Sequence, residues 1–382
     1  MSAPPLYFDH AATTPLDPRV RAAMFASLDA APGNPSATHA AGRAARERVE
    51  EARAEVAALL GAPAAAIVFT SGATEADNLA ILGAGRARPG GHVVSLRTEH
   101  RAVLDACRRL EREGHRLTLL TPARDGRVDP AAIAAALGPT TTLVSVMLVN
   151  NETGVIQDIA AIAAECRRRG VLLHVDAAQA AGRVPLDVSV LEADLVSLSA
   201  HKIHGPVGVG ALYVRREPRP ALQPLLVGGG QEGGLRPGTL PVHQLVGMGA
   251  AFRLARISGP AEAAALGLLR DRLWSALADL PGTYLNGHPT ARAPHILNVS
   301  FEGVDGEALL AGLGGLIVAS GAACGAESGE PSYVLRALGR DDALAQASLR
   351  FSLGRGQSAP QVDAAAAQVR EVVLRLRSLA PA

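Results

Sequence analysis

The stretches His174-Val-Asp-Ala-Ala-Gln179 and Ser199-Ala-His-Lys-Ile-His-Gly-Pro206 decide how this chain is expected to fold. At each of them an apolar run ends at polar residues. Such a run is typical of a buried parallel strand, and the carboxyl ends of parallel strands meet at the edge where open α/β sheets bind their ligands. We therefore expect Asp176 and Lys202 to lie side by side at that edge of a sheet.

A carboxylate beside a lysine suits the chemistry of pyridoxal phosphate (PLP). The lysine can form a Schiff base with the aldehyde of the cofactor, provided that its pKa is lowered enough for attack. The buried carboxylate can hold a proton on the ring nitrogen, which makes the ring an electron sink. Taken singly, Asp176 could be a helix cap and Lys202 a solvated loop residue, but the motifs below weigh against this alternative.

Length, charge and the first residues set outer limits on the class of protein. A chain of 382 residues is expected to form two or three domains with a large core. A formal net charge of +1 gives no reason to expect nucleic acid or a membrane as the main partner. The segment from Met1 to Asp9 has neither a basic start nor an apolar core, so no signal peptide is expected and the protein is predicted to be cytoplasmic.

The stretch from Ala308 to Ala326 offers the one membrane alternative. It carries no charge and is long enough for a membrane span. Its many glycines make a continuous helix unfavourable. We expect a buried strand that runs into a loop instead.

The three cysteines do not form a metal-binding or disulfide pattern. Cys107 and Cys166 lie in helix-like patterns, where a cysteine is usually a small buried apolar residue. Cys324 lies in the uncharged stretch rich in glycine and alanine. No CxxC pair or paired histidine spacing accompanies them, so neither a metal site nor a disulfide framework is predicted.

From Ala64 to Val214 short apolar runs alternate with helical patterns, which predicts a mainly parallel sheet with helices on both faces. The expected strands are Ile67–Thr70, Val93–Leu96, Leu143–Val149, Leu172–Val175, Leu195–Leu198 and Gly210–Val214. After the glycines at 228–230 the pattern becomes α+β, with helices at about 242–255 and 262–280, strands at 296–301 and 348–353, and a last helix ending near Leu379. We predict a large PLP-binding domain over 16–255, and a small domain of residues 1–15 and 256–382 that carries the cysteine loop.

Three motifs at strand ends could complete a cofactor site. Thr70-Ser-Gly-Ala-Thr-Glu75 joins a strand to a helix, where the first amides and hydroxyls could bind a phosphate, although an ordinary capping box has the same pattern. His100 opens the next helix and could stack on a flat ring or simply face water. An asparagine of the pair Asn150-Asn151 could hydrogen-bond a ring hydroxyl or form a turn.

These motifs belong to a longer series along the chain. The series is Asp9-His-Ala-Ala-Thr-Thr-Pro15, Gly33-Asn-Pro35, Thr70-Ser-Gly-Ala-Thr-Glu75, Thr98-Glu-His100, Val149-Asn-Asn-Glu-Thr-Gly154, His174-Val-Asp176, Ser199-Ala-His-Lys202, Arg236-Pro-Gly-Thr239 and Ser348-Leu-Arg-Phe-Ser-Leu-Gly354. In order and spacing, from about Tyr7 to about Leu379, it resembles the cysteine desulfurases, PLP enzymes of the class V aminotransferase group, and their NifS/IscS-like members in particular. The resemblance implies an α/β fold, type I of the PLP-dependent transferases, with a mainly parallel seven-stranded sheet and a smaller α+β C-terminal domain.

The same resemblance implies roles for individual residues around the cofactor. Lys202 would be the Schiff-base lysine, Asp176 the partner of the ring nitrogen, and His100 the residue that stacks on the ring and shuttles protons. A wider set would contact PLP at its phenolic oxygen (Asn151, Gln179) or its phosphate (Ala73, Thr74, Ser199, His201).

Substrate binding and assembly are implied in the same way. Asn34 and Arg350 would bind the carboxylate of the substrate, a task that suits a guanidinium group. Thr239 would reach the phosphate of a neighbouring subunit, so a homodimer is implied. The chain departs from the family pattern at Gly325 and Pro237, and neither change removes a catalytic group.

Cys324 would be the nucleophile that attacks the sulfur of L-cysteine and leaves L-alanine and a Cys324 persulfide. Small neighbours would give its loop mobility, although a cysteine in such a loop can also be incidental. The sulfur would pass to iron–sulfur cluster assembly, with thiolation of tRNA or of cofactors as other destinations, and Cys324 could ligate a cluster transiently. Selenocysteine lysis, aminotransfer, kynurenine cleavage and a catalytically silent homologue are the alternatives.

Overall fold

Seven strands form the central sheet of the computed structural model, which describes residues 5–320 and 330–379. The strands lie in the order β2-β8-β7-β6-β5-β3-β4. Their bounds are β2 Ile67–Thr70, β3 His92–Leu96, β4 Arg116–Leu120, β5 Thr141–Met147, β6 Leu172–Asp176, β7 Leu195–Ser199 and β8 Gly210–Val214. Only β8 is antiparallel to its neighbours, so the carboxyl ends of the other six strands meet at one edge. The mainly parallel seven-stranded sheet is confirmed.

Helices cover both faces of this sheet because each strand alternates its apolar side chains between two cores. In β2, Ile67 and Phe69 pack into one cluster and Val68 into another. The second face carries α3 (Ala73–Arg86) and α4 (Arg101–Arg112). The remaining helices of this part are α1 Pro18–Asp29, α2 Ala40–Leu59, η1 Ala64–Ala66, α5 Pro130–Ala136, α6 Ile159–Arg168, α7 Val188–Leu191 and η2 Gln231–Gly234.

Strand β4 is not among the strands that the apolar runs predict. It lies at the edge of the sheet, where it pairs only with β3, and its residues are exposed or half-buried. An edge strand needs fewer apolar residues than a central one, so its sequence signal is weak.

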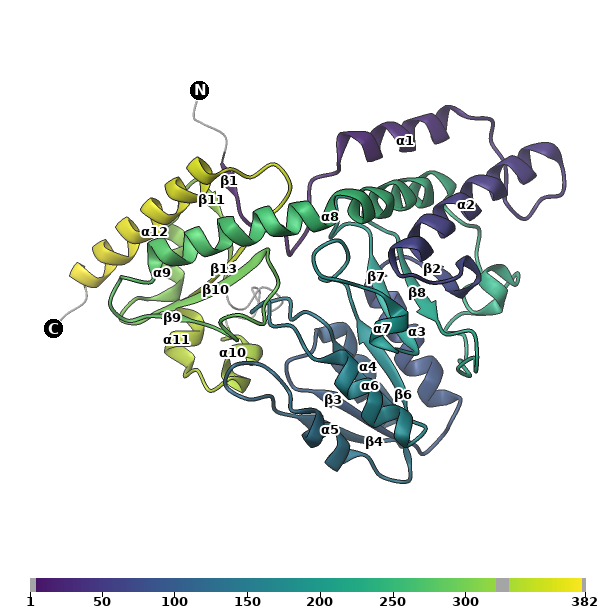
Figure 1. Cartoon of the computed structure of the whole chain (residues 1–382), viewed down its shortest axis with the longest axis horizontal. Coiled ribbons are helices and arrows are strands. Elements are labelled where there is room, and N and C mark those ends of the chain that lie inside the picture. Colours follow the sequence, from purple (N-terminus) through teal and green to yellow (C-terminus); the bar gives the residue numbers. More distant parts are fainter. Residues whose placement is uncertain (1–4, 321–329, 380–382) are drawn as a thin grey trace.

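A smaller part of the chain has its own sheet and core (Figure 1). Its four-stranded antiparallel sheet has the order β12-β13-β10-β9, and β1 pairs in parallel with β11. The strands are β1 Leu6–Tyr7, β9 Thr283–Leu285, β10 Ile296–Phe301, β11 Leu316–Ile317, β12 Ala319–Ser320 and β13 Ser348–Ser352, and the helices are α9 Gly306–Gly312, α10 Tyr333–Ala337, α11 Asp342–Gln346 and α12 Ala359–Leu379. Phe8 packs in the same core as Phe301 and Phe351, so the N-terminal segment belongs with these C-terminal elements.

One helix, α8 (Val242–Leu277), joins the two parts, where the sequence predicts two separate helices. It continues through Pro260, although a proline inside a helix costs about 3 kcal/mol or more. The helix survives because its first half packs in the core of the large sheet, with Leu245 to Ala255, and its second half in the core of the small one, with Leu266 to Leu277. The predicted domain boundary at 255/256 falls inside this helix, and the division into 16–255 and 1–15 with 256–382 stays a prediction.

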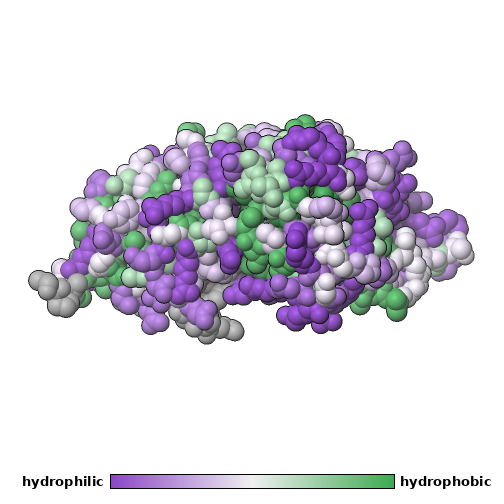
Figure 2. All heavy atoms as spheres, turned by 90° about the horizontal axis from the view of Figure 1, so that it is seen from below, coloured by the Kyte–Doolittle hydropathy of each residue, from purple (hydrophilic) through white to green (hydrophobic). Residues whose placement is uncertain are grey.

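The surface mixes polar and apolar side chains. Figure 2 shows a largely hydrophilic face, with apolar residues gathered near its centre. None of the helices in the described part of the chain is long and apolar enough to cross a membrane. Within the uncharged stretch after Ala308, the described residues form the end of α9 and the short strands β11 and β12.

Candidate active site

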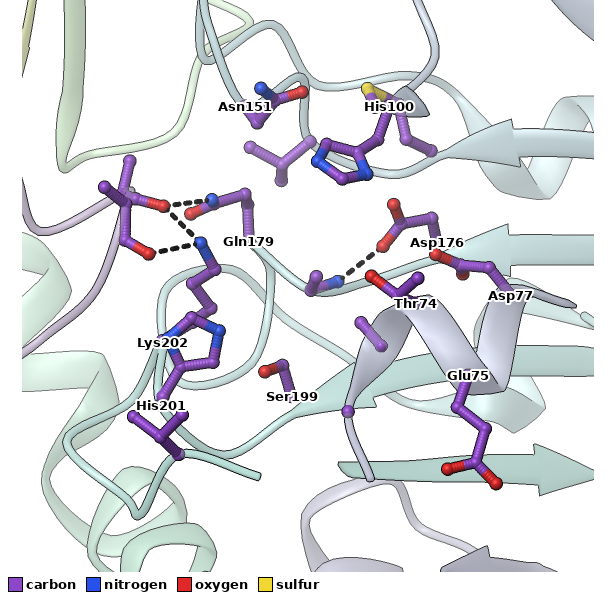
Figure 3. A pocket seen from close by; sticks show the side chains of 18 of the residues that line it. Thr74, Glu75, Asp77, His100, Asn151, Asp176, Gln179, Ser199, His201 and Lys202 are labelled. Atoms are coloured by element: carbon purple, nitrogen blue, oxygen red, sulfur yellow. Dashed lines mark hydrogen bonds between the residues drawn. The ribbon is translucent and has the colours of Figure 1, made fainter. Parts of the chain in front are cut away.

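A cavity of about 510 Å³ opens at the carboxyl edge of the large sheet (Figure 3). Most of the residues expected at the site line it: Ala73, Thr74, His100, Asn151, Asp176, Gln179, Ser199, His201, Lys202 and Arg350. Asn34 and Thr239 are exposed and do not line it. Cys324 lies outside the described residues. One subunit therefore assembles nearly the whole predicted set.

Lys202 enters the cavity from a tight turn that follows β7. The amides of Ile203 and Gly205 both donate to the carbonyl of Ala200, which closes the turn. A side chain at Gly205 would bring a Cβ within 2.7 Å of that carbonyl, so only glycine fits there. His204 takes a left-handed conformation with φ 65°, and its amide donates to Thr14 Oγ1 at 2.7 Å. These contacts fix the direction of the lysine side chain.

The ammonium group of Lys202 is held by the N-terminal segment. Lys202 Nζ donates to the carbonyls of Ala11 at 2.6 Å and Ala12 at 2.7 Å (Figure 3). Gln179 Nε2 donates to the same carbonyl of Ala11 at 2.8 Å. Lys202 is also the only lysine in the sequence; the other residues counted among lysine and arginine are all arginines. The chain thus has a single ε-amino group, and it lies in this cavity.

The end of the cavity at α3 suits a phosphate. Gly72 precedes the helix with φ 156°, and a Cβ built on it would meet nothing within 4 Å, so there is open space at the N-terminus of α3. The first amides of a helix have no partner within the helix and can donate to an anion there. The Ser199 hydroxyl and the His201 ring line the same cavity as Thr74. Burial and the neighbouring Lys202 lower the pKa of His201 to about 4, so its ring is neutral. The helix dipole and these donors favour an anion.

The opposite part of the cavity suits a heteroaromatic ring. Asp176 ends β6 and is 6% exposed; burial and the nearby Asp77 raise its pKa, while the Ala178 amide donates to its Oδ1 at 2.9 Å. His100 caps α4 by accepting the Ala102 amide on Nδ1 at 3.2 Å. A neutral ring that accepts on Nδ1 carries its proton on Nε2. His100 can therefore donate from Nε2.

Asn150 and Asn151 divide the two roles that the sequence left open. Asn150 forms the turn, because its side-chain oxygen accepts the amides of Glu152 at 3.0 Å and Thr153 at 2.9 Å. Asn151 lines the cavity, and its Oδ1 is buried without a hydrogen-bond partner among the described residues.

The residues around this cavity fit PLP. Ser199 Oγ, like Asn151 Oδ1, is buried without a partner in the described part of the chain. Buried polar atoms in proteins are nearly always hydrogen-bonded, so two such atoms facing one cavity indicate a polar ligand there. Ser199 would bind the phosphate with Thr74, Asn151 would bind a ring hydroxyl, and Asp176 would bind the ring nitrogen.

Arg350 brings a cation from the small sheet to the same cavity. It lies on β13 and is 2% exposed. Its Nη1 donates to the carbonyl of Asn151 at 2.9 Å and its Nη2 to Asp9 Oδ1 at 2.8 Å. Its Nε is buried without a partner among the residues described. A guanidinium group held in this way is well placed for a small carboxylate.

Sequence reasoning missed several residues that shape the site. Asp9 orients Arg350, and the carbonyls of Ala11 and Ala12 hold Lys202. Asp77 lines the cavity from the second turn of α3, and Glu99 lies buried beside His100. The only signal in the sequence that could have pointed to them is that the motifs of the family resemblance include Asp9, Ala11 and Glu99. A contact between distant segments cannot be deduced from either segment alone.

Fold and site together define a PLP-dependent enzyme of fold type I. The model of the family "Aminotransferase class-V" matches residues 6–365. The chain is 53% identical to the cysteine desulfurase IscS of Pectobacterium atrosepticum, over 99% of this chain and 95% of that protein. This chain belongs to the class V aminotransferase family, and within it to the NifS/IscS-like cysteine desulfurases.

Solved structures agree with this family. A NifS-like protein has a TM-score of 0.90 at 33% identity, covering 97% of this chain and 100% of that one. SspA, solved in complex with cysteine, has a TM-score of 0.82 at 36% identity, covering 91% of this chain and 98% of that one. The cofactor of this enzyme is PLP, which is the group that the cavity fits.

Proposed function

We propose that this enzyme transfers the sulfur of L-cysteine to Cys324, leaving L-alanine and a Cys324 persulfide. The C–S bond of the substrate breaks, an S–S bond to Cys324 forms, and the thiol proton of Cys324 balances the proton that alanine gains. The observation that carries the proposal is the convergence of Lys202, Asp176 and Arg350 on one cavity. A lysine, a ring-nitrogen partner and a carboxylate receptor are the groups that an amino acid substrate of a PLP enzyme requires.

Bound PLP supplies an electron sink for the electron pair left at the substrate Cα. Arg350 would hold the substrate carboxylate and so orient the Cα–H bond, with Asp9 keeping the guanidinium group in place. Asp176 would stay ionised against the ring nitrogen. Lys202 Nζ, or His100 through its ring, would take the Cα proton and return a proton to the product.

The flanks of the Cys324 segment support its role as nucleophile. On one side, Ala319 of β12 pairs with Arg350 of β13. On the other side, Ser332 Oγ donates to Glu152 at 2.5 Å, and the Tyr333 hydroxyl donates to the carbonyl of Glu99 at 2.7 Å. The described residues before and after Cys324 therefore lie against Arg350 on one side and against Glu99, the residue before His100, on the other.

Product analysis tests the proposed function directly. PLP-loaded protein given L-cysteine without a reductant should form L-alanine and protein-bound persulfide in equal amounts in the first turnover. L-serine, which lacks the sulfur but keeps the carboxylate and the amine, should yield no alanine. A keto acid in place of alanine would identify an aminotransferase and contradict the proposal.

We also propose that the working form is a homodimer, and that Thr239 of each subunit completes the phosphate site of the other. Thr239 and Asn34 are both exposed and away from the cavity of their own subunit, although both match motifs of the family resemblance. A residue that is needed at the site but lies outside it in one chain can act from the partner. Asn34 would help Arg350 in the same way.

Mixed dimers test the role of Thr239. The change Thr239→Ala should weaken PLP binding about ten- to a hundredfold, the value of one hydrogen bond to a charged group. A mixed dimer combines a Thr239→Ala subunit with a Lys202→Ala subunit. The site of the Thr239→Ala subunit keeps its own Lys202 and receives the intact Thr239 of the partner, so this site should bind PLP with parental affinity. If that site stays weak, Thr239 acts within its own chain.

The IscS relatives support a proposal for the destination of the sulfur. Two IscS proteins, of Pectobacterium atrosepticum and of Salmonella, are 53% identical to this chain. We propose that iron–sulfur cluster assembly is the main recipient, that thiolation of tRNA or of cofactors are further recipients, and that the reaction takes place in the cytoplasm.

A further inference from the structure

Three buried carboxyl groups meet beneath the cavity. They belong to Asp77 on α3, Glu99 in the loop before α4, and Asp176 at the end of β6, with exposed fractions of 1%, 0% and 6%. Asp77 interacts electrostatically with both of the others. Figure 3 shows Asp77 and Asp176 on the same side of the cavity. Three negative charges so close together in an interior would be very unfavourable.

Asp77 and Glu99 each have one hydrogen-bonded interaction and one oxygen left without a partner in the described part of the chain: the Ser197 side chain hydrogen-bonds Asp77, and the Met147 amide donates to Glu99 Oε1 at 3.0 Å. Asp77 Oδ1 and Glu99 Oε2 are buried without a hydrogen-bond partner among the described residues. No arginine of the described ranges forms an ion pair with Asp77, Glu99 or Asp176. Burial raises the pKa of Asp77 to about 7 and the pKa of Glu99 well above its ordinary value.

His174 and Cys107, which face Asp77, do not supply a compensating charge. His174 Nε2 is 3.5 Å from Asp77 Oδ1, but its two ring nitrogens already pair with the hydroxyls of Ser145 at 2.8 Å and Ser197 at 2.9 Å. Burial lowers the pKa of His174 to about 4, so the ring is neutral. Burial raises the pKa of Cys107 to about 12, so its thiol is neutral as well. His100 lowers the pKa of Asp77 and of Asp176, so it favours a negative charge on this pair without selecting which of the two carries it.

Asp176 is better equipped than Asp77 to keep a negative charge. It accepts the Ala178 amide at 2.9 Å, and it faces the position that the ring nitrogen would take. Asp77 has a hydrogen bond with the Ser197 side chain, but its Oδ1 has no donor among the described residues. When two carboxyl groups share one low-dielectric site, one ionises and the other retains its proton.

We propose that Asp77 is a positioning residue that holds a proton in the PLP-loaded enzyme, so that the only negative charge of the pair lies on Asp176, where it binds the protonated ring nitrogen. The inference rests on the assignment of Asp176 in the proposed function. Asp77 acts through Asp176 and not on the substrate. A proton on Asp77 prevents a second carboxylate from raising the pKa of Asp176 and neutralising it.

Infrared spectroscopy of the PLP-loaded protein tests the protonation of Asp77. One pH unit below the Asp77 pKa of about 7, the parent should show the C=O stretching band of a protonated, buried carboxylic acid. Asp77→Asn should lose this band. Asp105→Asn should keep it, because Asp105 is exposed and paired with Arg108 at 3.1 Å. A parent spectrum without a protonated aspartate band would overturn the proposal.

Isotope labelling assigns the band to an aspartate without any Asp77 variant. Parent protein carrying aspartate labelled at the side-chain carboxyl carbon should show an isotope shift in the same band, which separates it from any band of Glu99. A protonated acid band that does not shift would come from a glutamate, and would overturn the assignment to Asp77.

The affinity for PLP tests the positioning role. Asp77→Asn keeps a neutral side chain of the same size, so the PLP dissociation constant should stay within about threefold of the parent below the Asp77 pKa. If Asp77 were ionised, removing its charge beside a cationic ring would weaken binding about tenfold or more, which would contradict the proposal. Asp176→Asn should weaken binding and lower turnover. If it changes neither, the assignment of Asp176 fails, which is a different result from a failure at Asp77.

Discussion

Lys202→Ala is expected to lower the rate of alanine formation from L-cysteine by about 10⁴-fold or more, because the variant loses both the covalent anchor of PLP and a group that moves the Cα proton. Borohydride should fix the cofactor on the parent protein at Lys202, the only lysine of the chain. The variant, once denatured, should carry no cofactor on any side chain. The only other amine is the N-terminus, so mass spectrometry of the labelled peptide gives an unambiguous answer.

Lys202→Arg is the matched control for structure. Arginine keeps the positive charge near the carbonyls of Ala11 and Ala12, which accept hydrogen bonds from the lysine in the parent. The variant should fold with parental thermal stability and yet stay inactive, because a guanidinium group does not deprotonate to attack an aldehyde. Appreciable turnover by Lys202→Arg would mean that Lys202 only holds the N-terminal segment in place.

Cys324→Ala is expected to lower sulfur transfer by about three orders of magnitude or more, because it removes the nucleophile and leaves the cavity intact. Addition of L-cysteine should still change the absorbance of the bound cofactor. Neither persulfide nor catalytic amounts of alanine should form. Mass spectrometry for the persulfide and amino acid analysis for alanine measure the two products separately.

The two other cysteines supply matched controls. Cys107 and Cys166 are buried and free, and burial raises the pKa of each thiol to about 12, so neither is a nucleophile near neutral pH. Cys107→Ala and Cys166→Ala should keep parental rates. If Cys324→Ala also turns over L-cysteine at the parental rate, Cys324 is not the sulfur carrier. A selenocysteine lyase that needs no such thiol would be the simplest alternative.

The central sheet is the part of the fold that apolar patterning predicts best. Runs such as Leu195 to Leu198 are continuous because both faces of a parallel sheet are covered, and the polar residue that ends each run marks the ligand-binding edge. The structure deviates from this patterning at β4 and at α8, each for a reason of its own. The edge strand β4 is exposed or half-buried, so its sequence lacks the continuous apolar run that marks a buried strand. Helix α8 continues through Pro260 because its first half packs in the core of the large sheet and its second half in the core of the small one.

The sequence by itself determined the site residues that lie at the end of a single strand or at the start of a single helix. Asp176 ends β6, Lys202 follows β7, and His100 caps α4. Because parallel strands end at one edge, these residues converge whatever the details of packing. Their chemistry, together with the family resemblance, predicted PLP and cysteine desulfurization without any knowledge of tertiary contacts.

Only the tertiary structure decided which groups complete the site from distant segments. Arg350 reaches the cavity because β13 of the small sheet lies against the loop of Asn151, and Asp9 fixes its direction. Asp77 looks like an ordinary residue of an amphipathic helix until its carboxyl group is found buried beside Asp176. The pattern of a sequence records which side chains are apolar and how they repeat. Whether a polar side chain meets solvent, a cofactor or a second carboxylate depends on segments far away in the chain, and therefore on the folded structure.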